Sequence, residues 1–327
     1  MPRSFEELKP MLRPTGVHMG VMRVDAEKCT ACGLCLRNCP FKCWEMGEKG
    51  FPVMKADNAC FSCFNCLVAC PTEAVSIVES YHVDEGFFDT WLPVLKMPLE
   101  PRDAEDRPDD WNKVERTILE RRSVRNFKEN PIPESLIRRV LEAGRFAPSA
   151  GNHQPWKFTV VTDKAFIDQL EEACYAVWNG MYPMFQDDQT VMNLVDTVPV
   201  GAFDPRVQGG IRCVIRKELP IFNNAPVVIF LGCHENMAFP EQHSGICGQN
   251  MNLSAKSLGL GFCWSNFGSA VNFIPELKSR LGFDDPWRVY SSLCLGFPKF
   301  KQEGLVPRYF RPITWFRPGT EGPQVEG

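Results

Sequence analysis

The spacing of apolar residues predicts alternating helices and strands from residue 110 onward. Apolar residues at intervals of three to four predict four helices, at residues 110–121, 133–143, 164–178 and 244–258. Alternation or a short apolar run predicts three strands, at residues 156–160, 227–231 and 289–295. Asp110 is expected to cap the first helix and Pro133 to begin the second. This mixture of elements indicates one α/β-type domain.

The interval 180–224 breaks this pattern, because it is weakly periodic and carries several Gly and Pro residues. Long segments of that kind are typical of lids and binding loops. Four aromatic side chains in or beside it are expected to cover a pocket: Trp178, Tyr182, Phe185 and Phe203. The alternative is a pair of helices that packs against the core.

Composition excludes several classes of protein. Hydrophobic residues at 44% and charged residues at 23% are typical of a soluble globular protein and argue against disorder. The net charge of −4 gives no basic footprint for nucleic acid or an anionic membrane. The most apolar run, 225–233, is too short to span a bilayer, and the N-terminus has no apolar signal region. We therefore expect a cytoplasmic protein with neither nucleic-acid nor membrane partners.

The fifteen cysteines are unevenly distributed, with nine of them between Cys29 and Cys70. When residues 29–44 are placed over residues 60–75, four cysteines and a proline coincide. Such an internal repeat indicates a duplicated small fold. Because no secretory signal is visible, a reduced metal protein is favoured over a disulfide scaffold.

Each repeat has the pattern C-x2-C-x2-C-x3-C-P. Three thiolates on one loop can bind three corners of an iron–sulfur cube, while the fourth serves the other cube. The spacing therefore predicts two [4Fe-4S] clusters, one held by Cys29, Cys32, Cys35 and Cys70 and the other by Cys60, Cys63, Cys66 and Cys39. Structural zinc is the alternative, but zinc sites usually separate two cysteine pairs by a dozen or more residues.

Residues 21–80 resemble the bacterial two-cluster ferredoxins. Cys43 aligns with Ala74 of the second repeat, so we expect it to be a small buried side chain that fills space and binds no metal.

Residues 81–112 hold four prolines, and nine acidic residues against three basic ones, as an exposed linker would. Four apolar side chains are expected to pack its first part onto a domain: Phe87, Phe88, Trp91 and Leu92.

Two segments beyond the linker carry candidate cofactor chemistry, although G-x-G-x-x-G and the phosphate-loop motif are absent. The run 121–125 packs three guanidinium groups and a hydroxyl, which suit a phosphate, although a solvated charged face is the alternative. The loop 144–156 is dense in small and amide side chains, which can approach a planar ring and address it with donors and acceptors. Two histidine segments, at 233–235 and 243–245, lack metal-site spacing.

An R-R-S-x-R run, a helix and then A-P-S-x-x-N-x-Q-P-W resemble the nitroreductase family of FMN enzymes, over residues 113–317. The resemblance implies an α+β fold with a mainly antiparallel sheet flanked by helices, and a homodimer with FMN at the interface. It places the FMN phosphate and ribityl chain at Arg121, Arg122, Ser123 and Arg125. It places the flavin ring against Pro148, Ser149 and Asn152, and under the segment Cys263, Trp264, Ser265 and Asn266. Arg308 would return to the phosphate, with Arg311 as the alternative.

The expected function is an FMN oxidoreductase that takes electrons through its two clusters and reduces a small nitroaromatic, quinone or activated alkene. Its donor would be reduced ferredoxin or flavodoxin, or NAD(P)H through a reductase. No side chain is assigned as catalytic, because the chemistry belongs to flavin N5. Alternatives are reductive dehalogenation or another specialised flavin reduction, and an electron-transfer module of a larger complex. Low-potential clusters also favour an oxygen-poor host.

Overall fold

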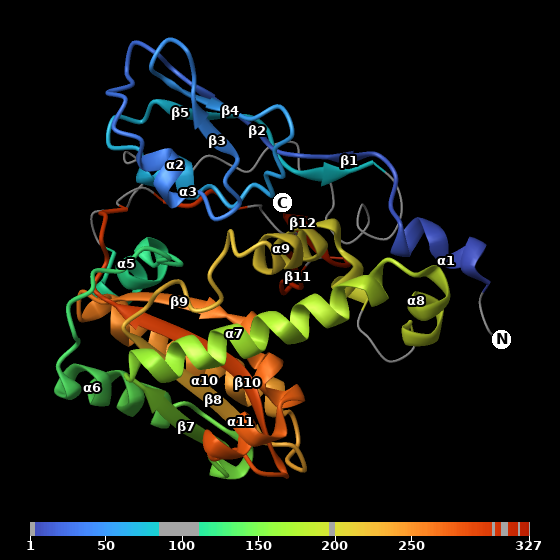
Figure 1. Cartoon of the computed structure of the whole chain (residues 1–327), viewed down its shortest axis with the longest axis vertical. Coiled ribbons are helices and arrows are strands. Elements are labelled where there is room, and N and C mark those ends of the chain that lie inside the picture. The colour runs from blue at the N-terminus through green and yellow to red at the C-terminus, as the bar shows by residue number, and fades with distance from the viewer. Residues whose placement is uncertain are drawn as a thin grey trace. The chain divides into compact units, whose positions relative to one another are not determined.

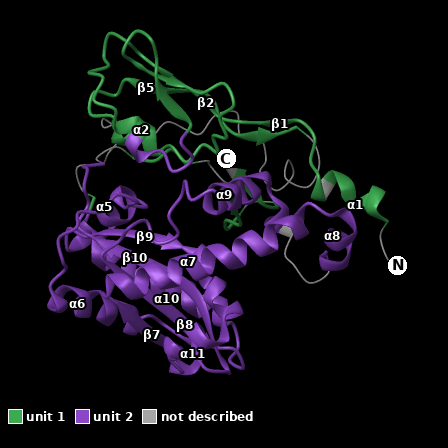
Figure 2. Ribbon diagram, viewed as in Figure 1, with its two compact units in different colours: residues 1–36, 43–111, 304–327 green, residues 37–42, 112–303 purple. Residues whose placement is uncertain are grey.

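The computed structural model describes residues 4–84, 111–195, 200–302, 305–308, 313–319 and 321–326. The chain forms two compact units, coloured separately in Figure 2. Unit 1 contains residues 1–36, 43–111 and 304–327, and unit 2 contains residues 37–42 and 112–303. Most of the expected linker lies outside the described residues, as do its four apolar side chains, Phe87, Phe88, Trp91 and Leu92.

The cysteine-rich region is built from two equivalent halves. Each half has a strand, a cysteine loop, a short helix and a second strand: β2 (Val21–Val24), α2 (Leu34–Asn38) and β3 (Trp44–Met46), then β4 (Pro52–Met54), α3 (Asn65–Ala69) and β5 (Val75–Glu79). The first strand of one half pairs antiparallel with the last strand of the other, β2 with β5, while β3 pairs with β4. The sequence repeat is therefore a structural duplication (Figure 1).

The backbone conformation repeats as well. Left-handed residues occur at the same places in both halves, at Ala31, Gly33 and Lys42 and again at Ser62, Phe64 and Glu73. Left-handed backbone is unfavourable for residues with a side chain. Because five of these six residues are not glycine, the loop geometry is imposed by the fold and not by glycine alone.

The remaining elements of unit 1 surround these halves in the sequence. Helix α1 (Phe5–Leu12) begins with a capping box in which Ser4 and Glu7 bond each other's backbone. Strands β1 (Val17–His18) and β6 (His82–Val83) pair, as do β11 (Ile313–Trp315) and β12 (Gln324–Glu326). Since β6 is paired, the start of the expected linker at residue 81 belongs to the folded part of unit 1.

Unit 2 contains a four-stranded antiparallel sheet. The strand order is β7 (Trp156–Val161), β8 (Val227–His234), β10 (Trp287–Gly296) and β9 (Gly261–Ser265). The helices are α5 (Lys113–Glu120), α6 (Glu134–Arg145), α7 (Lys164–Met181), α8 (Asp188–Leu194), α9 (Pro205–Ile215), α10 (Pro240–Ser257) and α11 (Pro275–Arg280). This architecture confirms the expected α+β fold. None of the described helices is long and apolar enough to cross a membrane.

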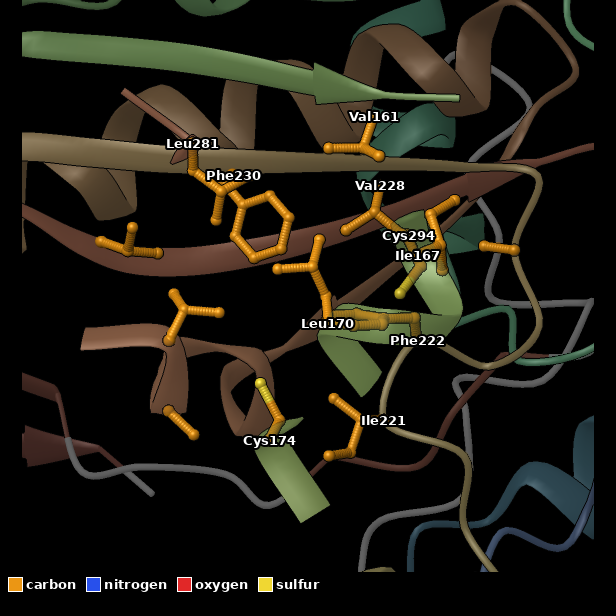
Figure 3. Packing of buried hydrophobic residues seen from close by; sticks show 14 of the residues in the cluster. Val161, Ile167, Leu170, Cys174, Ile221, Phe222, Val228, Phe230, Leu281 and Cys294 are labelled. Carbon is orange, nitrogen blue, oxygen red and sulfur yellow. The ribbon is translucent and has the colours of Figure 1, made fainter. Parts of the chain in front are cut away.

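Helices cover both faces of the sheet, so strand β8 is apolar along most of its length. Val228 and Phe230 point into the cluster that contains Leu170 and Cys174 of α7 (Figure 3). The alternate residue Ile229 packs with Met251 of α10 on the other face. Successive side chains of a strand point to opposite faces, which explains the uninterrupted apolar run.

Short 3-10 helices at Ala150–Asn152, Tyr182–Phe185, Val200–Phe203 and Asn266–Phe273 complete unit 2. The element types predicted from residue 110 onward are confirmed, whereas some ends differ. Asn112 caps α5 by accepting from the backbone N–H groups of Val114 and Glu115, so the expected cap at Asp110, outside the described residues, is wrong. Pro133 is the residue before helix α6 and not its first residue.

The weakly periodic interval 180–224 is mostly helical where it is described, and contains α8 and α9. Phe185 and Phe203 are buried and meet edge to edge at 5.9 Å between ring centroids. The Trp178 Nε1–H donates to the Phe267 carbonyl at 2.8 Å. These three aromatic residues therefore pack within unit 2, as the helical alternative predicts, and do not form an open surface over a pocket.

Candidate functional site

Four cysteines line one small cavity in unit 1: Cys29, Cys32, Cys35 and Cys70. Its wall also contains apolar side chains, among them Val24 and Val75. Cys29 and Cys32 lie on the loop before helix α2, Cys35 lies in the first turn of α2, and Cys70 follows helix α3. The structure thus brings together the first predicted ligand set, and an apolar wall with four thiols fits an iron–sulfur cube.

Backbone donors point at two of these sulfur atoms. Ala31 N–H donates to Cys29 Sγ at 3.4 Å, and Ala74 N–H donates to Cys70 Sγ at 3.2 Å. Burial raises the pKa of Cys70. Hydrogen bonds from the backbone of Thr72 and Ala74 and from the Thr72 hydroxyl lower it by a larger amount, so the net shift of the pKa is downward. The thiolate is the form that ligates metal.

The second predicted set has three members in unit 1, Cys60, Cys63 and Cys66, whereas Cys39 belongs to the segment 37–42 of unit 2. Gly20 N–H donates to the Cys60 carbonyl at 2.8 Å. A Cβ at Gly20 would lie 3.1 Å from Cys60 Sγ and 2.5 Å from Ser62 Oγ. Gly20 therefore makes room for this loop, which the sequence repeat does not indicate because its counterpart is Phe51.

The arginine-rich run lies beside strand β9. Ser123 forms a parallel bridge with Phe262, and Val124 N–H donates to the Phe262 carbonyl at 2.9 Å. Arg121, Ser123 and Arg125 are half-buried. The structure therefore joins two of the segments that the family resemblance assigned to FMN.

Arg122 has a different environment from its neighbours. Its side chain is buried, and Nη1 donates to the carbonyls of Leu119 and Arg121 at 3.0 and 2.8 Å. Helix α5 ends at Glu120, so these bonds satisfy carbonyls at its C-terminus.

Basic side chains surround two cavities that border this run. The larger, of about 1210 Å³, includes Arg125 and Lys299 in its wall, together with the acidic Glu129 and Glu134. The smaller, of about 450 Å³, has one acidic group, Glu120, and the cationic residues Arg122, Lys128, Lys256, Lys299 and Lys301. Such a concentration of positive charge fits a phosphate. Lys299 and Lys301 were not predicted, although they directly follow the Gly-Phe-Pro segment at residues 296–298.

The second family segment forms an exposed loop after α6. Ser149 Oγ accepts from Gln154 N–H at 2.9 Å, and Asn152 and Gln154 adopt left-handed backbone. Pro148 and Asn152 are exposed. Strained loops held in this way occur at ligand sites.

Buried His243 of α10 supports this loop. Its Nε2 accepts from Ala150 N–H at 3.2 Å. The sequence motifs do not mark His243, but it shares a buried helical face with Cys247 and Met251, at intervals of four residues.

The FMN contacts predicted on strand β9 and further along the chain differ in how deeply they are buried. Cys263 is buried beside Cys294, and burial raises its pKa, while Ser265 Oγ donates to the Ile221 carbonyl at 2.5 Å. Trp264 is half-buried and Asn266 exposed. Cys263 and Ser265 are thus part of the core packing of unit 2. Arg308 is exposed in unit 1, and Arg311 lies outside the described residues.

The six cysteines of unit 2 outside the segment 37–42 are all buried: Cys174, Cys213, Cys233, Cys247, Cys263 and Cys294. Burial raises the pKa of each, to about 12 for Cys174. Cys43 is also buried, as expected of a filler.

Both the cysteine-rich region and the larger domain match known protein families. Residues 118–297 match the model of the nitroreductase family, and residues 22–45 match the 4Fe-4S binding domain. A putative NADH dehydrogenase/NAD(P)H nitroreductase of Archaeoglobus fulgidus is 26% identical over 57% of this chain and 86% of its own. The nitrobenzene nitroreductase of Ectopseudomonas oleovorans is 28% identical over 56% of this chain and 86% of its own.

Among solved structures, a nitroreductase with bound FMN from Desulfitobacterium hafniense is 24% identical and gives a TM-score of 0.48, over 63% of this chain and all of its own. The family match at residues 118–297 spans more than half of the 327 residues. This protein therefore belongs to the nitroreductase family and is an FMN oxidoreductase with an added N-terminal 4Fe-4S binding domain.

Proposed function

We propose that this protein reduces a small organic acceptor with electrons that enter through two [4Fe-4S] clusters. The observation that carries the proposal is the cavity lined by Cys29, Cys32, Cys35 and Cys70, in the same chain as a nitroreductase-family domain. An iron–sulfur domain transfers single electrons and does no bond chemistry itself. Its covalent attachment to a flavin domain indicates that it supplies that domain with electrons.

The second cluster would be held by Cys60, Cys63, Cys66 and Cys39. Its support is the duplication, because the left-handed backbone positions of the first cysteine loop recur in the second. Two loops of the same conformation and spacing are expected to bind the same cluster type.

Bound FMN supplies the exchange between single-electron and two-electron transfer. Arg121, Ser123 and Arg125 would hold its phosphate and ribityl chain, with Lys299 adding positive charge. Arg122 would act indirectly, because its guanidinium bonds the end of α5. We propose that Arg308 is the C-terminal residue that contacts the FMN phosphate.

The flavin ring would lie against the loop at Pro148, Ser149 and Asn152 and near Trp264 and Asn266. Cys263 and Ser265 would support that surface from within the core. Exposed Phe146 and Phe239, at 70% and 66%, favour a homodimer that covers apolar surface of unit 2. A monomer at working concentrations in sedimentation velocity would contradict the dimer.

The acceptor classes we propose are nitroaromatics, quinones and activated alkenes. A quinone takes two electrons and two protons to give the quinol, and solvent would supply the protons because no side-chain acid is assigned. The donor would be reduced ferredoxin or flavodoxin, or NAD(P)H through a reductase. Reductive dehalogenation would use the same cofactors with another acceptor.

Anaerobic stopped-flow spectroscopy of the purified holoprotein tests this function. Reduced ferredoxin is expected to bleach the clusters first and the flavin second, and then to support turnover of a quinone or nitroaromatic. A Cys70→Ser variant should keep FMN but lose fast flavin reduction by ferredoxin. Equal flavin reduction rates in both proteins would refute electron entry through the clusters. Fast flavin reduction with no turnover of any small acceptor would instead support an electron-transfer module.

A further inference from the structure

Two histidines of unit 1 face each other across a short ribbon. His18 of β1 and His82 of β6 are partners in the antiparallel register. Their rings stack with centroids 4.3 Å apart and planes 4° apart. Directly opposed residues on paired strands project from the same face, which explains the contact. The pair lies outside both cysteine motifs and outside the flavin segments.

One edge of the stacked rings faces oxygen atoms that can accept a hydrogen bond or bind a metal ion. Glu79 Oε1 lies 3.8 Å from His18 Nδ1 and 3.7 Å from His82 Nδ1, and the Ser80 carbonyl oxygen lies 3.0 Å from His82 Nδ1. One ligand atom from each of His18, Glu79 and His82 lies within 4.8 Å of the others. Ligands about 2.1 Å from a tetrahedral zinc ion lie about 3.4 Å apart, so small side-chain rotations would close this group around one ion.

The opposite edge faces a second carboxylate. Asp84 Oδ2 lies 2.8 Å from His18 Nε2, and Asp84 Oδ1 lies 3.6 Å from His82 Nε2. A carboxylate that accepts from Nε2–H leaves the Nδ1 lone pair for a metal and fixes the orientation of the ring.

The backbone leaves space for that carboxylate. Gly16 has a positive φ of 65°, and a Cβ there would lie 2.6 Å from Asp84 Oδ2. Asp84 N–H donates to the Gly16 carbonyl at 3.0 Å. Any other residue at position 16 would displace Asp84 from the rings.

All four ring nitrogens therefore face oxygen acceptors, while a neutral imidazole carries only one N–H. Two protonated rings would satisfy these oxygens but would place like charges 4.3 Å apart. A divalent cation bound at the two Nδ1 atoms and Glu79 would leave both rings neutral, with the Nδ1 proton that His82 can donate to the Ser80 carbonyl displaced by the metal. The charge of the cation would balance the carboxylates of Glu79 and Asp84.

We propose that His18, His82 and Glu79 bind one divalent transition-metal ion, of which zinc is the best match, while Asp84 positions the two imidazoles. Imidazole and carboxylate ligands suit zinc, and the partly exposed side chains leave a position for water. The ion would join β1 to β6, a two-stranded ribbon that is marginal by itself. It would thereby tie the segment before the first cysteine loop to the end of the ferredoxin-like region.

The test uses cluster-loaded holoprotein, so that the cluster cysteines are occupied. The protein is dialysed anaerobically against ZnCl2 and then against buffer, and zinc and iron are counted by mass spectrometry. One zinc per chain is expected in the wild type at unchanged iron content. The double variant His18→Ala/His82→Ala should lose it, and Glu79→Gln, which keeps size and fold, should weaken binding at least tenfold. His234→Ala, which changes a histidine of unit 2, is the matched control and should retain the zinc.

X-ray absorption at the zinc edge gives an independent reading. Two imidazole nitrogens and oxygen are expected in the first shell. A sulfur shell near 2.3 Å would place the zinc on cysteine and overturn the proposal. Zinc retained by the double histidine variant, or none bound by the wild type, would overturn it as well.

Asp84→Asn tests the positioning role separately. It should retain one zinc per chain at saturation, with affinity lowered about tenfold to a hundredfold. An unchanged affinity would remove Asp84 from the site while leaving the ligand assignment in place.

Discussion

The close approach of Gly20 to the second cysteine loop gives a sharp prediction. In Gly20→Ala the new Cβ would lie 2.5 Å from Ser62 Oγ and 3.1 Å from Cys60 Sγ. An ordinary contact begins near 3.4 Å, so the hydroxyl must move by about 0.9 Å. That movement lengthens the 2.7 Å bond that Tyr81 N–H donates to Ser62 Oγ.

The magnitude follows from these two contacts. Overpacking a tight site costs about 1–3 kcal/mol, and weakening one hydrogen bond costs about 1 kcal/mol. A total of about 3 kcal/mol corresponds to roughly a hundredfold lower population of the cluster-binding loop. The cavity of the first ligand set does not include this contact and should be unaffected.

Iron analysis and electron paramagnetic resonance of the reduced holoprotein provide the assay. Iron is expected to fall from about eight to about four atoms per chain, and the spectrum from that of two interacting clusters to that of one. Gly180→Ala in helix α7 is the control, because its Cβ would meet no atom within 4 Å and its backbone is helical. Adding Ser62→Ala to Gly20→Ala removes the closest contact and should restore part of the iron. Full iron content and an unchanged spectrum in Gly20→Ala would refute the steric reasoning.

Three further predictions concern unit 2. Arg121→Ala and Arg125→Ala should each weaken FMN binding about tenfold or more while leaving the cluster spectrum intact, because a charged hydrogen bond contributes about 1.5–3 kcal/mol. Glu171→Gln should stabilise unit 2 in denaturant titrations above the usual carboxyl pKa of 4.5, because burial raises the pKa of Glu171. The stabilisation should grow with pH until Glu171 is ionised in the folded state. Iodoacetamide at pH 8 should not modify Cys174, Cys233 or Cys247 in the native protein. Burial raises the pKa of each of these thiols to about 12, so only about one molecule in ten thousand carries the reactive thiolate.

A different result would contradict each of these three predictions. Unchanged FMN affinity in both arginine variants would remove the run 121–125 from the phosphate site. The amide at position 171 keeps an acceptor for the 2.9 Å bond from Phe222 N–H, so a pH-independent effect would exclude charge burial as its cause. Rapid alkylation of the native protein would show that unit 2 opens locally.

Periodicity predicted the elements of unit 2 where one face is strongly apolar. The run around Phe230 was recognised as a buried strand because helices cover both sides of the sheet. The interval 180–224 gives a weak periodic signal because its helical segments are short and interrupted by Gly and Pro, although the structure packs Phe185 against Phe203 and buries one face of α9. The Asn112 cap was missed because capping depends on local backbone geometry and not on the apolar period.

The sequence alone determined the duplicated cysteine loops and the family of the larger domain, and it predicts which segments meet the cofactor. Those features are local, since ligand spacing and short motifs lie within a few residues of one another. Tertiary structure decided the roles that depend on contacts between residues far apart in the sequence. Arg122 bonds the end of α5, Cys263 packs in the core, Gly20 clears the second cysteine loop, and His18 meets His82 across a strand pair. Burial and strand register set these roles, because they depend on which side chains the folded chain brings together.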